Sequence, residues 1–103
     1  MLFELSPEAD RDLEDIFDYT ARQWGVDQAD RYLIELETGV EAFVTGSKHF
    51  RHWPEINPRL RSIRCQRHHI FLIEREQRAP LIVAILHEKM DLITRIRARL
   101  APE

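Results

Sequence analysis

Residues 6–46 read SPEADRDLEDIFDYTARQWGVDQADRYLIELETGVEAFVTG and decide the fold. Ser6 is a good helix N-cap, and Pro7 suits the first helical position, where its missing N–H is no loss. The residues that follow at helical spacing are mostly apolar: Ala9, Leu13, Ile16, Phe17, Thr20 and Trp24. Gly25 is the expected stop. The first half of this stretch therefore predicts an amphipathic helix.

The second half of the stretch predicts another amphipathic helix. We expect Asp27 to be its N-cap and Gly46 to mark its end. Its apolar positions are Ala29, Leu33, Leu36, Val40, Phe43 and Val44. A link of one or two residues makes the pair an antiparallel helical hairpin. The first helix also carries several acidic residues that we interpret as a solvated face: Asp10, Asp12, Glu14, Asp15 and Asp18.

Outward from the hairpin, the pattern changes to short apolar runs. Leu2–Leu5 predicts a short strand before it, and 47–58 a loop after it. The three strands expected next are Leu60–Arg64, His68–Arg75 and Leu81–Glu88, with Cys65–Arg67 as a turn. Asp91 caps a last helix that reaches about Leu100. The order is β-α-α-β-β-β-α, which predicts an α+β fold with the hairpin packed on a small, mainly antiparallel sheet.

The last two predicted strands also predict which side chains meet. If their turn is centred between Gln77 and Arg78, paired residue numbers sum to about 155. Arg67 and His68 then lie opposite His87 and Glu88. His69 and Lys89 are close by. We therefore expect basic and imidazole groups to gather at one end of the central strands.

Length and composition predict one small domain over residues 1–103. Cys65 is the only cysteine, so no intramolecular disulfide can form, and a reducing cytoplasm suits the chain. The N-terminus does not resemble a signal peptide. No apolar run approaches the roughly 18 residues expected of a membrane span. We expect a cytoplasmic protein.

The two halves of the chain carry opposite charge. Residues 1–46 hold 12 Asp and Glu against 3 Lys and Arg, a balance of −9. Residues 47–103 hold 6 Asp and Glu against 12 Lys and Arg, a balance of +6, and all five histidines. We therefore expect an acidic helical surface and a separate basic surface that could meet nucleic acid or an acidic protein segment.

Several segments, taken in order, closely resemble the toxins of the ParE/RelE superfamily, and the ParE branch in particular. They are residues 5–16 (LSPEADRDLEDI), Tyr19-Thr20, Trp24-Gly25, residues 29–33 (ADRYL), residues 60–62 (LRS), residues 69–71 (HIF) and residues 85–91 (ILHEKMD). No single segment is decisive, but their order and spacing are specific. The resemblance covers residues 3–91.

This resemblance implies the fold predicted above and the toxin component of a type II toxin-antitoxin system. ParE-like members act on DNA gyrase and are neutralised by a ribbon-helix-helix antitoxin of the ParD type. RelE-like members are ribosome-dependent endoribonucleases that cut mRNA, which is the alternative function. An inactive interaction module with the toxin fold is a third reading. Since the position that resembles the nuclease's strand arginine is His69 and no Tyr follows Tyr32, target inhibition is favoured over RNA cleavage.

The candidate site residues follow from these two functions. A nuclease would need an acid, a base and cations around one phosphate, for which the candidates are His69, His87, Arg67 and Lys89. Target binding would use cations, for which the candidates are Arg61, Arg67, Lys89, Arg95 and Arg97. Arg95, Arg97 and Arg99 also suit a helix C-terminus. His49 and His52 with His87 do not complete a tetrahedral metal set, so we predict no metal site and no cofactor.

Overall fold

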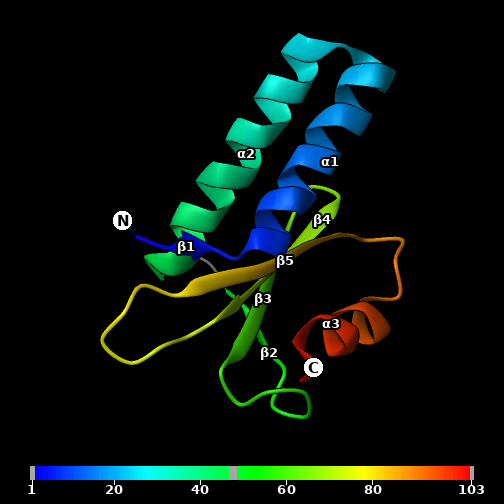
Figure 1. Cartoon of the computed structure of the whole chain (residues 1–103). Coiled ribbons are helices and arrows are strands. Elements are labelled where there is room, and N and C mark those ends of the chain that lie inside the picture. The colour runs from blue at the N-terminus through cyan, green and yellow to red at the C-terminus, as the bar shows by residue number, and fades with distance from the viewer. Residues whose placement is uncertain (1, 47–48, 103) are drawn as a thin grey trace.

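A helical hairpin covers one face of a five-stranded sheet, and a short C-terminal helix covers the other (Figure 1). The computed structural model describes residues 2–46 and 49–102. The predicted loop 47–58 therefore begins with two residues outside the described part. In chain order the elements are β1 (Glu4–Leu5), α1 (Pro7–Trp24), α2 (Val26–Val44), β2 (Arg51–His52), β3 (Leu60–Cys65), β4 (His68–Ile73), β5 (Leu81–His87) and α3 (Leu92–Leu100).

The hairpin begins as predicted, and its link is one residue long, within the predicted one or two. The Ser6 hydroxyl accepts a 3.0 Å hydrogen bond from the Ala9 N–H and caps α1. Gly25 is the single residue between the helices, at φ +94°, a conformation that favours glycine. The predicted Asp27 cap is wrong: α2 begins at Val26, with Gly25 at the cap position and Asp27 in the first turn. A one-residue link leaves no room for a separate cap.

Trp24 does not join the core as its helical spacing suggested. Its side chain is 74% exposed, and the neighbouring Val26 is 58% exposed. Both residues lie at the hairpin turn, which projects beyond the sheet (Figure 1). Amphipathic spacing predicts the face of a helix but not how far along that helix a covering layer extends.

Within the described residues, no helix is long and apolar enough to cross a bilayer.

The sheet has the strand order β1-β5-β4-β3-β2. β1 pairs parallel with β5, and the remaining pairs are antiparallel. Strand β2 was not predicted: Arg51 and His52 lie in the expected loop, yet they pair with Ser62 and Arg61. These two polar residues, beside a proline-containing segment, do not show the alternation of apolar and polar residues that predicts a strand. The pairing with β3 creates this strand.

The register of β4 and β5 is as predicted at the histidine end and shifts by one residue farther along. His68 pairs with His87, and Phe71 pairs with Ala84. The next pair is Leu72 with Ile82, so Val83 forms a bulge in β5. The bulge places Val83 and Ala84 in the same core, on the α3 side of the sheet.

The sheet separates two hydrophobic cores. The core under the hairpin contains Ala9, Ile16, Leu36, Val40, Phe43, Ile63, Cys65, Ile70, Leu72, Ile82 and Ile85. The core under α3 contains Trp53, Leu60, Phe71, Val83, Ala84, Leu86 and Ile96. The Trp53 indole N–H donates a 2.8 Å hydrogen bond to the Ser62 hydroxyl, so the polar atom of this buried side chain has a partner.

Cys65 ends strand β3 and is buried, which corrects its prediction as a turn residue. Its side chain packs against Gly39 of α2. A β-carbon added at Gly39 would lie 2.7 Å from the Cys65 Sγ and 3.3 Å from its Cβ. Gly39 therefore allows α2 to approach the sheet closely.

We predict that Gly39→Ala lowers the free energy of unfolding by up to about 2 kcal/mol. Alanine favours a helix by roughly 1 kcal/mol over glycine, but overpacking costs about 1–3 kcal/mol. In a Cys65→Ala background the close sulfur is absent, so the same substitution should become neutral or stabilising. Urea unfolding of the four proteins in this cycle measures the effect. A loss of equal size in both backgrounds would contradict the contact.

Candidate functional site

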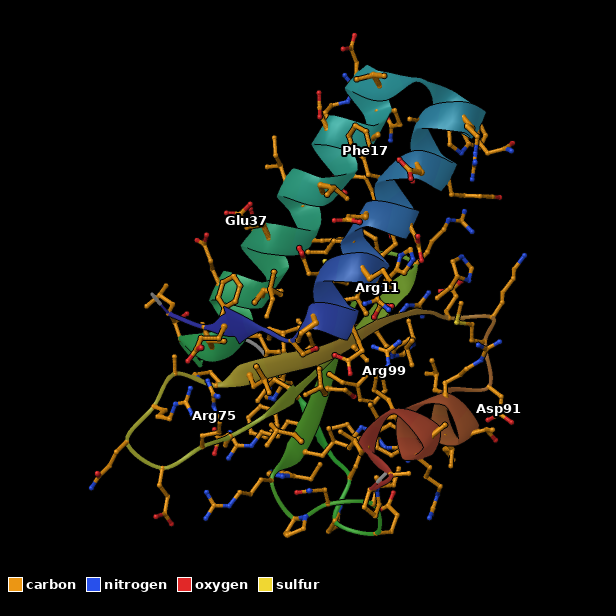
Figure 2. The ribbon with its side chains drawn as sticks, in the orientation of Figure 1. Arg11, Phe17, Glu37, Arg75, Asp91 and Arg99 are labelled. Atoms are coloured by element: carbon orange, nitrogen blue, oxygen red, sulfur yellow. The ribbon has the colours of Figure 1, made fainter. Side chains whose placement is uncertain are left out.

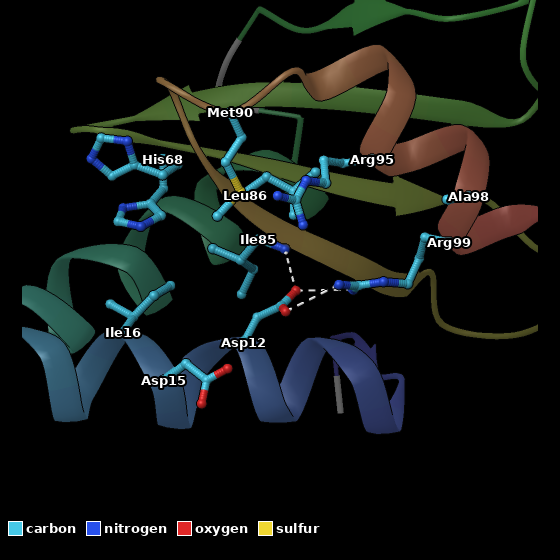
Figure 3. Close-up of a pocket in the computed structure, with 11 residues that line it drawn as sticks. Asp12, Asp15, Ile16, His68, Ile85, Leu86, Met90, Arg95, Ala98 and Arg99 are labelled. Atoms are coloured by element: carbon cyan, nitrogen blue, oxygen red, sulfur yellow. Dashed lines mark hydrogen bonds and ion pairs between the residues drawn. The ribbon is translucent and has the colours of Figure 1, made fainter.

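A half-open cleft of about 520 Å³ lies between α1, the end of β5 and α3 (Figure 3). Its apolar lining includes Ile16, Ile85, Leu86 and Met90. Its polar lining consists of Asp12, Asp15, His68, His87, Arg95 and Arg99. The cleft thus combines an apolar floor with carboxylates from α1 and arginines from α3, and imidazoles from β4 and β5 lie at one end.

The Asp12 carboxylate joins three elements at the wall of this cleft (Figure 3). Its Oδ2 accepts a hydrogen bond from the Ile85 N–H at 2.9 Å and from Arg99 Nη1 at 3.0 Å, and its Oδ1 accepts from Arg99 Nη2 at 3.1 Å. Arg99 Nη1 also donates to the Val83 carbonyl at 2.9 Å. The prediction that Asp12 belongs to the solvated face is wrong. Its side chain is only 16% exposed.

The imidazole of His68 is held between α2 and β5. The Tyr32 hydroxyl and His68 Nδ1 share a 2.6 Å hydrogen bond. Because the Arg67 N–H donates to the same hydroxyl at 3.3 Å, the arrangement suits a hydroxyl that donates to Nδ1. Burial, and then the neighbouring His87, lower the pKa of His68 from 6.5 to about 4. Burial also raises the pKa of Tyr32. His68 is therefore neutral near pH 7.

His87 lies beside His68, with ring centroids 5.1 Å apart in an edge-to-face arrangement. Its Nδ1 accepts a 3.1 Å hydrogen bond from the Lys89 N–H in the turn that follows β5. The predicted pairing of Arg67 with Glu88 is also present, since the Glu88 N–H donates to the Arg67 carbonyl at 2.8 Å. The predicted gathering of imidazole and basic residues at this end is confirmed.

His69 lies on the other face of the sheet. It follows His68 in β4, and successive strand residues point to opposite faces. Its partners across the sheet are Arg64 and Leu86, and Leu86 belongs to the core under α3. Burial, and then Arg64, lower the pKa of His69. His69 and His87 do not face one common site.

The candidate target-binding cations lie in different surroundings. Arg61 forms a 2.6 Å ion pair with Glu74 and stacks over the Phe50 ring. Arg67, Lys89, Arg95 and Arg97 are exposed. Of these, only Arg95 lines the cleft. Within the described residues, no three His, Cys, Asp or Glu side chains are placed to hold a metal ion.

Local sequence patterns missed three residues of this site. The sequence indicates no role for Tyr32, places His68 only within the predicted cluster, and favours Arg99 as a helix-end cation. Arg99 and Asp12 are 87 residues apart in sequence, so no local spacing connects them. The predicted separation of charge is not complete, because Glu4 and Asp12 form ion pairs with arginines of the second half.

We predict that Asp12→Ala lowers the free energy of unfolding by about 2–3 kcal/mol. The change leaves a partly buried guanidinium and a strand N–H without their acceptor. Urea unfolding measures the loss. The exposed Arg59–Glu76 pair provides the control, and Glu76→Ala should change stability by less than about 0.5 kcal/mol. Equal effects at the two sites would contradict a structural role for Asp12.

We predict that His68 makes folding sensitive to mild acid. Above pH 6.5 both states hold a neutral imidazole. As the pH falls from 6.5 towards 4, the unfolded chain binds a proton that the folded chain does not, so stability decreases. The loss between pH 7 and pH 5 should be about 2 kcal/mol. Urea unfolding of His68→Gln should show a loss smaller by that amount. An unchanged loss would contradict this assignment.

Comparisons with known proteins agree with the fold and with the resemblance in the sequence. The family model for the ParE toxin of type II toxin-antitoxin systems, parDE, matches residues 3–92. A Toxin ParE from Escherichia coli is 44% identical over 96 residues, which cover 93% of each chain. A Toxin ParE1 from Mycobacterium tuberculosis is 35% identical over 88 residues, covering 85% of this chain and 90% of that relative.

A solved structure of a chromosomal ParDE TA system from P. aeruginosa shares the fold. Its TM-score is 0.69 at 15% identity, over 82% of this chain and 92% of that one. It supports the α+β arrangement of hairpin, sheet and C-terminal helix. With the family model extending over most of the sequence, the chain belongs to the ParE toxins of type II toxin-antitoxin systems.

Proposed function

We propose that this toxin inhibits DNA gyrase in the cytoplasm and is neutralised by a ParD-like ribbon-helix-helix antitoxin. Membership of the ParE family supports an antitoxin partner and fits gyrase as the target. The opposite charges of the two halves of the chain suit a protein that acts by binding. In this proposal the toxin blocks its target without breaking a bond.

The observation that favours inhibition over RNA cleavage is the division of the imidazoles between two faces. Cleavage through a 2′-hydroxyl needs a base for that hydroxyl and an acid for the leaving oxygen, both at one phosphate. His69 of β4 pairs with Leu86, the residue before His87 in β5. Because successive strand residues point to opposite faces, the imidazoles of His69 and His87 lie on opposite sides of the sheet. His87 also directs its Nδ1 to the Lys89 N–H. The two imidazoles thus do not form an acid-base pair.

One observation favours the alternative, a ribosome-dependent endoribonuclease of the RelE type. His69 is half-buried beside Arg64, and the positive charges of Arg64 and Arg51 both help to lower its pKa. Its lowered pKa keeps the imidazole neutral near pH 7, the state that accepts a proton. A single base with two nearby cations could bind a phosphate on that face. This alternative needs an acid from another source.

Target binding on the basic side is assigned to Lys89, Arg95 and Arg97, with Arg61 and Arg67 as further candidates. Lys89, Arg95 and Arg97 are exposed: Lys89 precedes α3, Arg95 lines the cleft, and Arg97 lies in the last turn of α3. Arg61 is held by Glu74, so its charge is already partly neutralised. Removal of an exposed cation should therefore weaken target binding more than removal of Arg61.

We predict that Lys89→Ala, Arg95→Ala and Arg97→Ala each weaken inhibition of gyrase supercoiling several-fold. The differences from wild type should shrink at high salt, where exposed charge contacts are screened. His69→Ala and His87→Ala should inhibit as wild type does, once unfolding curves show that they are folded. Addition of the cognate antitoxin should restore supercoiling and raise the melting temperature of the toxin.

The same proteins tested on ribosome-bound mRNA separate the functions. Under the alternative, a folded His69→Ala should cut at least about 10²-fold more slowly than wild type. Cleavage by a wild type that leaves gyrase untouched would replace our proposal with the nuclease. A wild type that binds its antitoxin and affects neither reaction would identify an inactive interaction module.

A further inference from the structure

A second concave surface lies on the hairpin, away from the cleft. This hairpin groove measures about 420 Å³ and is lined by six residues. Its floor is apolar and consists of Leu13, Phe17 and Leu33. Its rim is a row of α1 carboxylates, Asp10, Glu14 and Asp18. Figure 2 shows Phe17 between the two helices.

The three rim carboxylates are spaced four residues apart and therefore lie along one face of α1. All three are exposed. None of them takes part in the ion pairs that the described residues form. Like charges at this spacing destabilise a helix. A cationic partner along this row would reduce that repulsion.

The groove also lies on the part of the hairpin that lacks a complete third layer. Toward its turn, large side chains face water: Tyr19 is 60% exposed and Ile34 is 62% exposed. Phe17 and Leu33 are only partly buried. Both walls are helices whose backbone groups bond within the helix, so the groove offers no strand edge to an extended peptide. A third helix would cover the apolar floor.

We propose that the hairpin groove docks a helix on the toxin's target, with apolar residues toward the floor and lysines or arginines toward the rim. This inference rests on the proposed inhibition of gyrase, and it adds a contact separate from the basic residues near α3. An enzyme that handles DNA presents rows of Lys and Arg to phosphates. Cations four residues apart on a helix repeat every ~6 Å, which is also the repeat of the rim.

The test compares two charge-matched variants in a gyrase supercoiling assay. The rim variant combines Asp10→Asn, Glu14→Gln and Asp18→Asn. The control variant combines Asp30→Asn, Glu37→Gln and Glu41→Gln, which removes the same charge from exposed positions of α2 outside the groove. The rim variant should need about tenfold more toxin for half-inhibition, and the control less than about threefold.

Antitoxin affinity, measured on the same proteins, identifies what occupies the groove. The rim variant should bind the cognate antitoxin as wild type does. A rim variant that inhibits gyrase as well as wild type overturns the inference alone. Equal losses in rim and control variants also overturn it, because net charge would then explain both. Loss of antitoxin binding with inhibition retained assigns the groove to the antitoxin. A wild type that does not inhibit gyrase overturns the proposed function and this inference together.

Discussion

The carboxylate of Asp12 is the point on which the arrangement of the domain depends. It holds α1 against the edge of β5 through the Ile85 N–H and binds Arg99 of α3, which in turn binds the Val83 carbonyl. One ion pair thus connects the hairpin layer, the sheet and the C-terminal helix. It also occupies the edge of β5 beyond the short β1 strand, where unpaired backbone groups could otherwise pair with a strand of another chain. The wall of the cleft is a consequence of this contact.

Much of this arrangement could be predicted from local sequence patterns, because local physics dictates it. Helical spacing and the Ser6 cap predict α1, and alternation with turn position predicts that His68 lies opposite His87. Two of the errors arise from pairing with another segment. Asp12 is indistinguishable from its acidic neighbours until Arg99 is brought to it, and β2 exists only because β3 pairs with it. In both cases the residue pattern of the segment itself does not indicate its partner.

The residue types of the candidate site could be predicted from the sequence, but the positions of their side chains could not. Residue types and register bring imidazoles and cations to one end of the sheet, but which face each side chain takes decides the chemistry. His68 turns toward Tyr32, and burial lowers its pKa, while its neighbour His69 turns to Arg64 on the other side. The fold supplies the position, and alternation along the strand separates the functional groups.

The close approach of α2 to β3 at Gly39 has a practical consequence for measuring how this toxin moves. Cys65 is the only thiol in the chain, and its side chain is 7% exposed beneath the helix. Its sulfur lies 3.6 Å from the Glu35 carbonyl. A thiol reagent can react only when the helix and the sheet separate. In the regime of rapid reclosing, the labelling rate divided by that of an open thiol gives the equilibrium constant for this opening. The native chain therefore carries its own reporter of how tightly the hairpin is closed on the sheet.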